Sequence, residues 1–289
     1  MRTLIARCFR LLFSIRFFRK RYYGIVLRIF QPFKLFRDVI RITCYDQDLK
    51  MKLDLDEWIQ QHIYFLGYFD YPGVQFLKKN LGEDDIFIDA GANIGSYTLI
   101  AAKQVGKTGR VYAFEPAGAA YKRLCENIEI NEYSNIITEK KGLLDMNSTI
   151  DLFLANKTNL GMSSIYHHDS ESGTVERIET TKLDVYVDNQ NITRVDLIKL
   201  DIEGSEMLAL QGMQKTLEKF KPKVLIELKE ETHARSEYSI NDIIGYLNSH
   251  GYEKWYIDDK GDCSRDIENK PEGYYNFLFI PAIPETSER

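Results

Sequence analysis

The sequence is poor in cysteine, and the few cysteines that it has are far apart. Only four occur in 289 residues: Cys8, Cys44, Cys125 and Cys263. None belongs to a C-x-x-C pair, and none lies near a histidine at a spacing typical of zinc ligands. This pattern argues against a disulfide scaffold and a structural zinc site. It predicts reduced thiols in a cytoplasmic protein.

Long uncharged hydrophobic runs are also missing from the N-terminal segment. Residues 1–41 contain 11 Lys or Arg and a single acid, and their longest uncharged stretch is the six residues 22–27. A membrane-spanning helix needs about 20 apolar residues and a signal peptide about 7–15. The sequence therefore predicts neither. Because Phe, Leu, Ile and Tyr alternate with the basic residues, an amphipathic helix on an anionic membrane surface is expected, with a helix packed on the rest of the chain as the alternative.

The charge of the chain is divided unevenly. The net charge is −5, but residues 1–41 carry +10, which leaves −15 for the remaining 248 residues. An acidic body gives no support for nucleic-acid binding. We expect a basic amphipathic segment over residues 1–45 and one domain over residues 46–289. The expected location is the cytoplasm, or the inner face of a membrane if the basic segment binds lipid.

From residue 85 onward, short apolar runs alternate with segments of helical period. The runs expected to form strands are 86–90, 110–115, 135–142, 196–202 and 223–228. Their nearly continuous apolar character indicates parallel strands covered on both faces. Two last strands, 252–258 and 275–281, are expected to form a terminal hairpin. The expected fold is an α/β doubly wound sheet.

Residues 146–194 interrupt this alternation between the third and fourth expected strands. Apolar and polar side chains alternate there in three runs, 149–155, 161–166 and 175–187. This period indicates a small antiparallel insertion. Ligands of open α/β sheets bind at the carboxyl edge, which is where we expect the insertion to lie.

The turn after the first expected strand lacks the third glycine of a dinucleotide fingerprint. In the run Asp89-Ala90-Gly91-Ala92-Asn93-Ile94-Gly95 the sequence reads G-x-x-x-G, and Ser96 stands where G-x-G-x-x-G needs its last glycine. Glycines allow close approach of the backbone, and the following helix start offers free N–H groups. A carboxylate, an amide and backbone N–H groups suit an amino-acid zwitterion and a ribose better than a pyrophosphate.

Glu115 ends the second expected strand. A carboxylate at this position can accept hydrogen bonds from both hydroxyls of a ribose. Such an acid also fits NAD, so an NAD-linked oxidoreductase remains an alternative at this point.

Four stretches of the chain together resemble the FkbM family of S-adenosylmethionine-dependent methyltransferases. They are FIDAGANIGSYT, VYAFEP, DLIKLDIEGSE and KVLIEL, and the resemblance covers about residues 46–281. It implies the seven-stranded, Rossmann-like class I methyltransferase sheet with an antiparallel last strand. It also implies a methyl donor bound by Asp89, Gly91, Asn93, Gly95 and Glu115, with the adenine near Gly142, Leu143 and Asp145. It implies nothing about residues 1–41.

The acids that follow the fourth and fifth expected strands are the candidate catalytic groups. Methyl transfer from a sulfonium is an in-line displacement in which alignment contributes much of the rate. A hydroxyl acceptor must also lose a proton, and a positioned base helps by about 10²–10⁴. Asp201 and Glu227 are our candidates for that base, and Glu203 completes the cluster. A Mg²⁺ ion held by these three carboxylates is a further option.

Other polar and aromatic residues have weaker claims. His167, His168 and His233 could each supply a base, although loop histidines are more often surface residues. Tyr64 and Tyr68 are candidates for a lid over the donor, whereas Trp58 and Trp255 are expected in the core.

The sequence thus predicts an enzyme that transfers a methyl group from S-adenosylmethionine to a hydroxyl of a carbohydrate or other small metabolite. Its alternatives are an NAD-linked oxidoreductase and a non-catalytic membrane-surface adaptor that keeps a vestigial donor fold.

Overall fold

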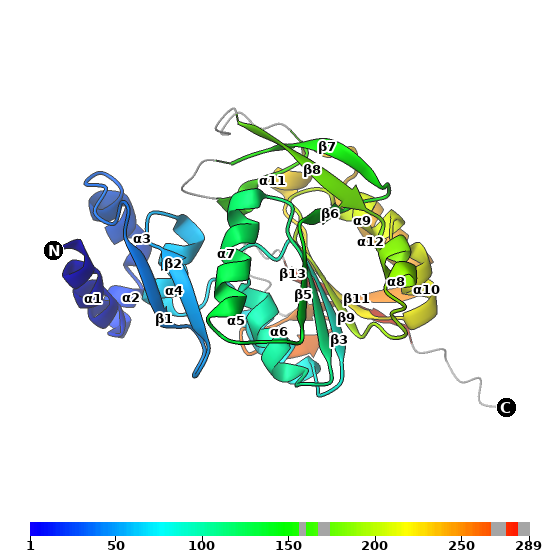
Figure 1. Cartoon of the computed structure of the whole chain (residues 1–289), viewed down its shortest axis with the longest axis horizontal. Helices are drawn as coiled ribbons and strands as arrows, with labels where there is room; N and C mark the ends of the chain where they lie inside the picture. Colours follow the sequence, from blue (N-terminus) through cyan, green and yellow to red (C-terminus); the bar gives the residue numbers. More distant parts are fainter. Residues whose placement is uncertain (156–159, 167–173, 267–275, 283–289) are drawn as a thin grey trace.

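An eight-stranded, mostly parallel sheet forms the centre of the molecule in a computed structural model that describes residues 1–155, 160–166, 174–266 and 276–282 (Figure 1). The strand order is β12-β11-β13-β10-β9-β3-β4-β5. The parallel strands are β3 (Ile86–Ala90), β4 (Arg110–Phe114), β5 (Ile136–Glu139), β9 (Leu197–Leu200) and β10 (Lys223–Glu227). The predicted α/β sheet of seven strands is confirmed, and one two-residue strand extends its edge.

The predicted terminal hairpin closes one side of the sheet. β11 (Tyr252–Ile257) and β13 (Asn276–Pro281) pair antiparallel, and β13 also pairs antiparallel with β10. The short β12 (Cys263–Ser264) pairs with the end of β11 and is the strand that the sequence analysis did not include.

Helices cover both faces of the sheet, as expected for a doubly wound fold (Figure 1). On one face lie α5 (Tyr71–Asn80), α6 (Ser96–Gln104) and α7 (Gly118–Glu129), and on the other lie α8 (Leu183–Asn189), α9 (Glu206–Gln211), α10 (Gln214–Phe220) and α12 (Ile240–Ser249). The strands are apolar on both sides because both sides are buried; all four residues of β9 are buried. β3 and β9 are neighbours at the point where the strand order reverses, so a crevice opens above their carboxyl ends.

The predicted insertion is a separate three-stranded sheet at the carboxyl edge (Figure 1). Its order is β6-β8-β7, from β6 (Lys141–Leu143), β7 (Ser148–Phe153) and β8 (Val175–Thr181). The expected strand 135–142 is therefore wrong as one strand, because the chain passes from β5 in the large sheet to β6 in the small one, before the predicted start of the insertion at residue 146. β7 and β8 are antiparallel as expected, but β6 runs parallel to β8. Residues 183–187, expected to continue the alternating run, lie in α8 instead, where Leu183, Tyr186 and Val187 are buried. A short helical turn, η2 (Leu160–Met162), also belongs to this region.

The N-terminal residues form a compact lobe beside the sheet (Figure 1). It contains α1 (Arg2–Phe13), α2 (Arg16–Arg19), α3 (Tyr22–Ile25), η1 (Val26–Phe30), a hairpin of β1 (Ile40–Cys44) with β2 (Lys50–Asp54), and α4 (Trp58–Leu66). The expected division after residue 45 lies within the hairpin. No helix among the described residues is both long enough and apolar enough to cross a bilayer.

Aromatic packing holds this lobe together. The ring of Phe13 lies 5.2 Å from that of Tyr22 and 5.5 Å from that of Phe65 on α4. Phe30 and Phe36 approach to 4.7 Å, and all five rings are buried. One side of the basic segment therefore packs on the rest of the chain, which is the alternative that the sequence left open.

Candidate functional site

A cavity of about 270 Å³ lies above the carboxyl ends of β3, β4, β9 and β10. The turn after β3, the insertion and the first residues of α4 all contribute to its wall. Small-molecule sites commonly measure about 300–1,000 Å³, so the cavity suits a metabolite-sized ligand.

The glycine turn brings the first wall of the cavity against β9. Gly91 has φ +79°, and a Cβ atom placed on it would lie 1.9 Å from the carbonyl oxygen of Asp201. The Gly91 and Ala92 N–H groups both donate to the carbonyl of Phe114 at 3.0 Å. Asn93 also has a positive φ, of 49°, which asparagine tolerates better than most residues. Only glycine fits position 91 without moving the backbone.

Glu115 is held by the same turn. Its carboxylate accepts hydrogen bonds from the backbone N–H groups of Asn93 and Ala117, each at 2.8 Å. Burial raises the pKa of Glu115 to about 7, although these two bonds lower it. Each carboxylate oxygen accepts one of the bonds and has capacity for a second. The group therefore remains able to accept both hydroxyls of a ribose.

Asp89 lies at the base of the cavity, fully buried. Thr98 donates to one of its oxygens at 2.6 Å, and the other oxygen has no hydrogen-bond donor among the described residues. Burial raises the pKa of Asp89, against the opposing charge of Lys199. A buried acceptor without a donor is costly, so this oxygen is suited to a ligand N–H or ammonium group.

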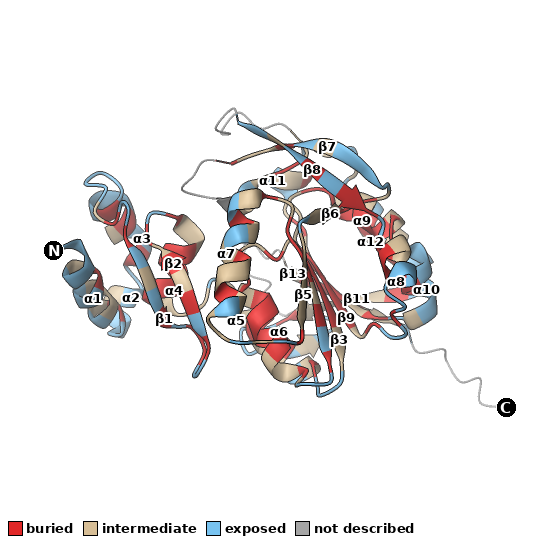
Figure 2. Cartoon of the chain, in the orientation of Figure 1, coloured by how far each residue is buried: buried red, intermediate tan, exposed pale blue. Residues whose placement is uncertain are grey.

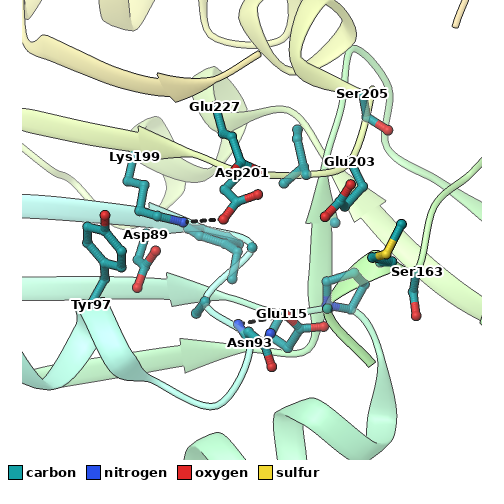
Figure 3. A pocket seen from close by; sticks show the side chains of 18 of the residues that line it. Asp89, Asn93, Tyr97, Glu115, Ser163, Lys199, Asp201, Glu203, Ser205 and Glu227 are labelled. Carbon is teal, nitrogen blue, oxygen red and sulfur yellow. Dashed lines mark hydrogen bonds and ion pairs between the residues drawn. The ribbon is translucent and has the colours of Figure 1, made fainter. Parts of the chain in front are cut away.

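The second wall is a cluster of three carboxylates and two lysines, of which Figure 3 shows Asp201, Glu203, Glu227 and Lys199. Lys199 Nζ lies 3.0 Å from Asp201 Oδ2, and Lys229 Nζ lies 2.6 Å from Glu227 Oε2 and 4.0 Å from Glu203 Oε1. Lys199 lies on β9 and Asp201 follows the last residue of that strand, so the two are two positions apart and their side chains leave the same side of the chain. Glu203 adopts φ +51° in the turn before α9, a conformation of the kind that clusters at functional sites.

These charges separate the pKa values of the three acids. Burial raises the pKa of Asp201, but the ammonium groups of Lys199 and Lys229 outweigh that effect and lower it. Burial and the neighbouring charge of Asp201 raise the pKa of Glu227, against the opposing charge of Lys229. Burial raises the pKa of Glu203 to about 7 despite the opposing charge of Lys229. The pKa of Asp201 is thus lowered and those of Glu203 and Glu227 are raised, so the three neighbouring acids differ in how readily they bind a proton.

The structure brings nine of the predicted site residues to one cavity. They are Asp89, Gly91, Asn93, Glu115, Gly142, Leu143, Asp201, Glu203 and Glu227. Gly95 and Asp145 are not among the residues that line it. Gly95 instead begins α6 with φ +92°, and a Cβ there would lie 2.8 Å from Leu124 on α7. Leu144, which precedes Asp145 in the sequence, does line the cavity.

The histidines and the candidate lid residues lie elsewhere. His167 and His168 fall outside the described residues, and His233 packs behind the site with its Nε2 3.4 Å from Glu206 Oε2. Neither Tyr64 nor Tyr68 lines the cavity. Tyr64 is buried beside Arg10, whose guanidinium lies 4.9 Å from its ring.

Aromatic residues that the sequence analysis did not assign to the site form its third wall. Trp58 and Phe69 line the cavity; Trp58 packs against the hydrophobic core as expected and also contributes to this wall. Tyr97 lines it as well, and its ring lies 4.7 Å from Lys199 Nζ. The Tyr97 hydroxyl donates to Asp70, which also accepts from Asn276 Nδ2 at 2.9 Å. Position 97 follows the glycine turn by two residues, and that proximity was the available signal.

Residues 89–254 match the methyltransferase FkbM domain, which is more than half of the chain. This protein belongs to the FkbM methyltransferase family. The match spans both walls of the cavity, from Asp89 on β3 to Glu227 on β10 and beyond. The family assignment decides against the NAD-linked oxidoreductase that Glu115 alone left open.

Three relatives show how far the similarity extends. The chain is 28% identical over 151 residues to Methyltransferase 1 of Beauveria bassiana, covering 45% of this chain and 59% of that protein. It is 28% identical over 185 residues to the hexuronic acid methyltransferase AglP of Haloferax volcanii, covering 61% and 71%. A solved methyltransferase FkbM from Methylobacillus flagellatus superimposes with a TM-score of 0.46 at 17% identity, covering 76% and 65%.

Proposed function

We propose that this FkbM-family protein transfers a methyl group from S-adenosylmethionine to a hydroxyl of a carbohydrate or a similar small polyol. The observation that carries the proposal is the contact of the glycine turn with Asp201. Because a Cβ on Gly91 would overlap the Asp201 carbonyl, the donor-binding turn and the acidic cluster form adjoining walls of one cavity. The related hexuronic acid methyltransferase supports a sugar-like acceptor.

The residues of the first wall fit this donor. S-adenosylmethionine supplies an activated methyl group on a sulfonium, with a ribose and an amino-acid tail for recognition. Glu115 can accept the ribose hydroxyls, and the buried Asp89 oxygen can accept from the tail. Gly142 and Leu143 offer an apolar strand edge for the adenine. These assignments follow from the chemistry of the side chains and their place in the cavity.

The acids of the second wall have different tasks in the proposal. Asp201 remains ionised and paired with Lys199, so it is a weak base and a suitable counter-charge to a sulfonium. Glu227 pairs with Lys229, while burial and the charge of Asp201 raise its pKa. Glu203, with a pKa of about 7, best matches a general base that works near neutral pH. We therefore assign Glu203 to accept the proton of the acceptor hydroxyl, with Glu227 and Lys229 as the charged pair beside it.

Magnesium is not needed for this chemistry. The three carboxylates place one oxygen each within 4.8 Å of the others, so the arrangement is close enough to hold a cation. Two lysine ammonium groups already pair with Asp201 and Glu227, however, and a divalent ion would have to displace them.

Substitution of the acids tests the proposal. Glu203→Gln is expected to lower kcat for methyl transfer by about 10²–10⁴ while leaving the affinity for S-adenosylhomocysteine within about two-fold. Radiolabelled methyl transfer to uronic acids and to fractionated glycans measures the first quantity, and calorimetry measures the second. Glu231→Gln, on the exposed side of α11 (Glu230–His233), is the matched control and should behave as wild type.

The same assays can overturn each half of the proposal. Normal turnover in Glu203→Gln, Asp201→Asn and Glu227→Gln would exclude catalysis by the cluster. Failure of wild-type protein to bind S-adenosylhomocysteine would exclude the donor. A retained donor site with no transfer to any hydroxyl would favour the non-catalytic adaptor.

A further inference from the structure

The exposed apolar side chains of this protein are concentrated in the N-terminal lobe. Among the described residues, 16 large hydrophobic side chains are exposed, and 11 of them lie within residues 1–42. Isolated exposed hydrophobic residues are normal on a soluble surface, but a concentration of this kind marks an interaction surface.

Helix α1 shows how the lobe keeps a second apolar face. Phe13 is completely buried against Tyr22 and Phe65, and Ala6 is completely buried as well. Leu4 and Leu11, seven residues apart and therefore on one side of the helix, are 66% and 73% exposed. One face of α1 thus packs into the lobe, and the opposite face has no cover (Figure 2).

The segments after α1 also expose apolar side chains. Phe17 on α2 is 56% exposed, Leu27 on η1 is 59% exposed, and Phe33 in the following turn is 74% exposed. Figure 2 shows most of the outer surface of α1 and α2 in the colour of exposed residues, at the end of the molecule away from the sheet. The lobe therefore exposes apolar side chains on several of its segments while its core rings stay buried.

Basic residues surround these side chains. Nine of the 11 Lys or Arg residues within 1–41 are exposed, and the single acid of the segment, Asp38, lies 3.8 Å from Arg37. A partner for this surface must be anionic and must also accept apolar side chains. Nucleic acid offers charge without an apolar phase, and a second copy would bring one strongly basic segment against another. An anionic lipid surface offers both properties.

We propose that the N-terminal lobe docks on an anionic lipid bilayer, with Leu11, Phe17, Leu27 and Phe33 entering the headgroup–acyl boundary and the basic residues contacting lipid phosphates. The docking surface is independent of the methyl-transfer proposal, because none of the described residues that line the cavity belongs to 1–41.

Sedimentation with vesicles tests the docking. Full-length protein is expected to bind vesicles that contain phosphatidylglycerol, and to bind far less to phosphatidylcholine alone or at high salt. Leu11→Glu with Phe33→Glu should weaken binding by about ten-fold or more, since each buried apolar side chain contributes strongly to partitioning. Replacing one exposed arginine by glutamine should weaken binding by about five-fold. Met146→Glu, at an exposed hydrophobic residue outside the lobe, is the control and should bind as wild type.

Point substitutions are preferable to deletion of the segment. Tyr22 and Phe30 belong to the core of the lobe, so a truncated chain would lose packing as well as the surface. An unchanged melting temperature confirms that the substituted proteins are folded. The proposal is overturned if wild-type protein ignores both kinds of vesicle, if the Leu11 and Phe33 variant binds as well as wild type, or if the surface instead drives dimer formation in sedimentation velocity experiments.

Discussion

Replacing Gly91 by alanine should disrupt the junction between the two walls of the cavity. The added Cβ would lie 1.9 Å from the Asp201 carbonyl oxygen. An ordinary contact would require the two groups to separate by about 1.5 Å. Alanine must also adopt φ +79°, which costs an L-residue about 1–2 kcal/mol. Overpacking adds about 1–3 kcal/mol, so the free energy of unfolding should fall by about 2–5 kcal/mol.

Two measurements check this magnitude. At about 2–4 °C per kcal/mol, the melting temperature should fall by at least about 4 °C. The affinity for S-adenosylhomocysteine should fall by at least about ten-fold, because the displacement moves the N–H group of Asn93 away from Glu115. Calorimetry on protein kept well below its melting temperature separates the two effects.

Gly245→Ala is the matched control for this experiment. Gly245 lies on the exposed side of α12, and a Cβ there would meet no atom within 4 Å. Alanine should stabilise that helix by about 0.4–1 kcal/mol and leave donor binding unchanged. If Gly91→Ala keeps the wild-type melting temperature and donor affinity, the close approach of the turn to β9 is refuted.

Three further outcomes follow from the charges. Lys199→Met should lower the free energy of unfolding by about 3–5 kcal/mol, because it leaves the carboxylate of Asp201 without its nearest cation, whereas Lys79→Met in an exposed pair should cost less than about 1 kcal/mol; urea titration measures both. Burial raises the pKa of Glu206 to about 8, so the folded state binds its proton more tightly than the unfolded state and stability should fall as pH rises from about 5 to 8. In Glu206→Gln this loss should shrink by up to about 1.4 kcal/mol per pH unit, and an unchanged profile would contradict the assignment. Chelation by EDTA should leave methyl transfer unchanged, and a loss restored by Mg²⁺ would show that the carboxylates hold a metal.

The strands of the sheet were the most predictable part of the fold. The expected run 86–90 is β3 without change, and the expected runs near β4, β9, β10, β11 and β13 differ by at most two residues at either end. Parallel strands buried on both faces need uninterrupted apolar residues, so their positions are written locally in the chain. The site turns were predictable for the same reason, because glycine and acid positions at strand ends carry their own signal.

The lobe and the third wall of the cavity were not predictable in this way. A tryptophan in the sequence predicts a core residue because its side chain is large and mostly apolar. Only the tertiary packing shows that Trp58 also lines the cavity. The ion pair of Lys199 with Asp201 requires the two side chains to leave the same side of the chain where β9 ends. The sequence alone does not show at which residue that strand ends. Residues 183–187 alternate between apolar and polar like a strand but form part of helix α8. In the helix Leu183, Tyr186 and Val187 lie on one face, and that face is buried.

Helix α4 has a consequence for how this protein can change. Trp58 lines the cavity, while the ring of Tyr23 on α3 packs against it from the lobe side at 5.5 Å. Trp58 therefore belongs both to the wall of the cavity and to the packing of the lobe. A substitution of Tyr23 is expected to change the position of Trp58 in the cavity, so we expect residues 23 and 58 to vary together in evolution.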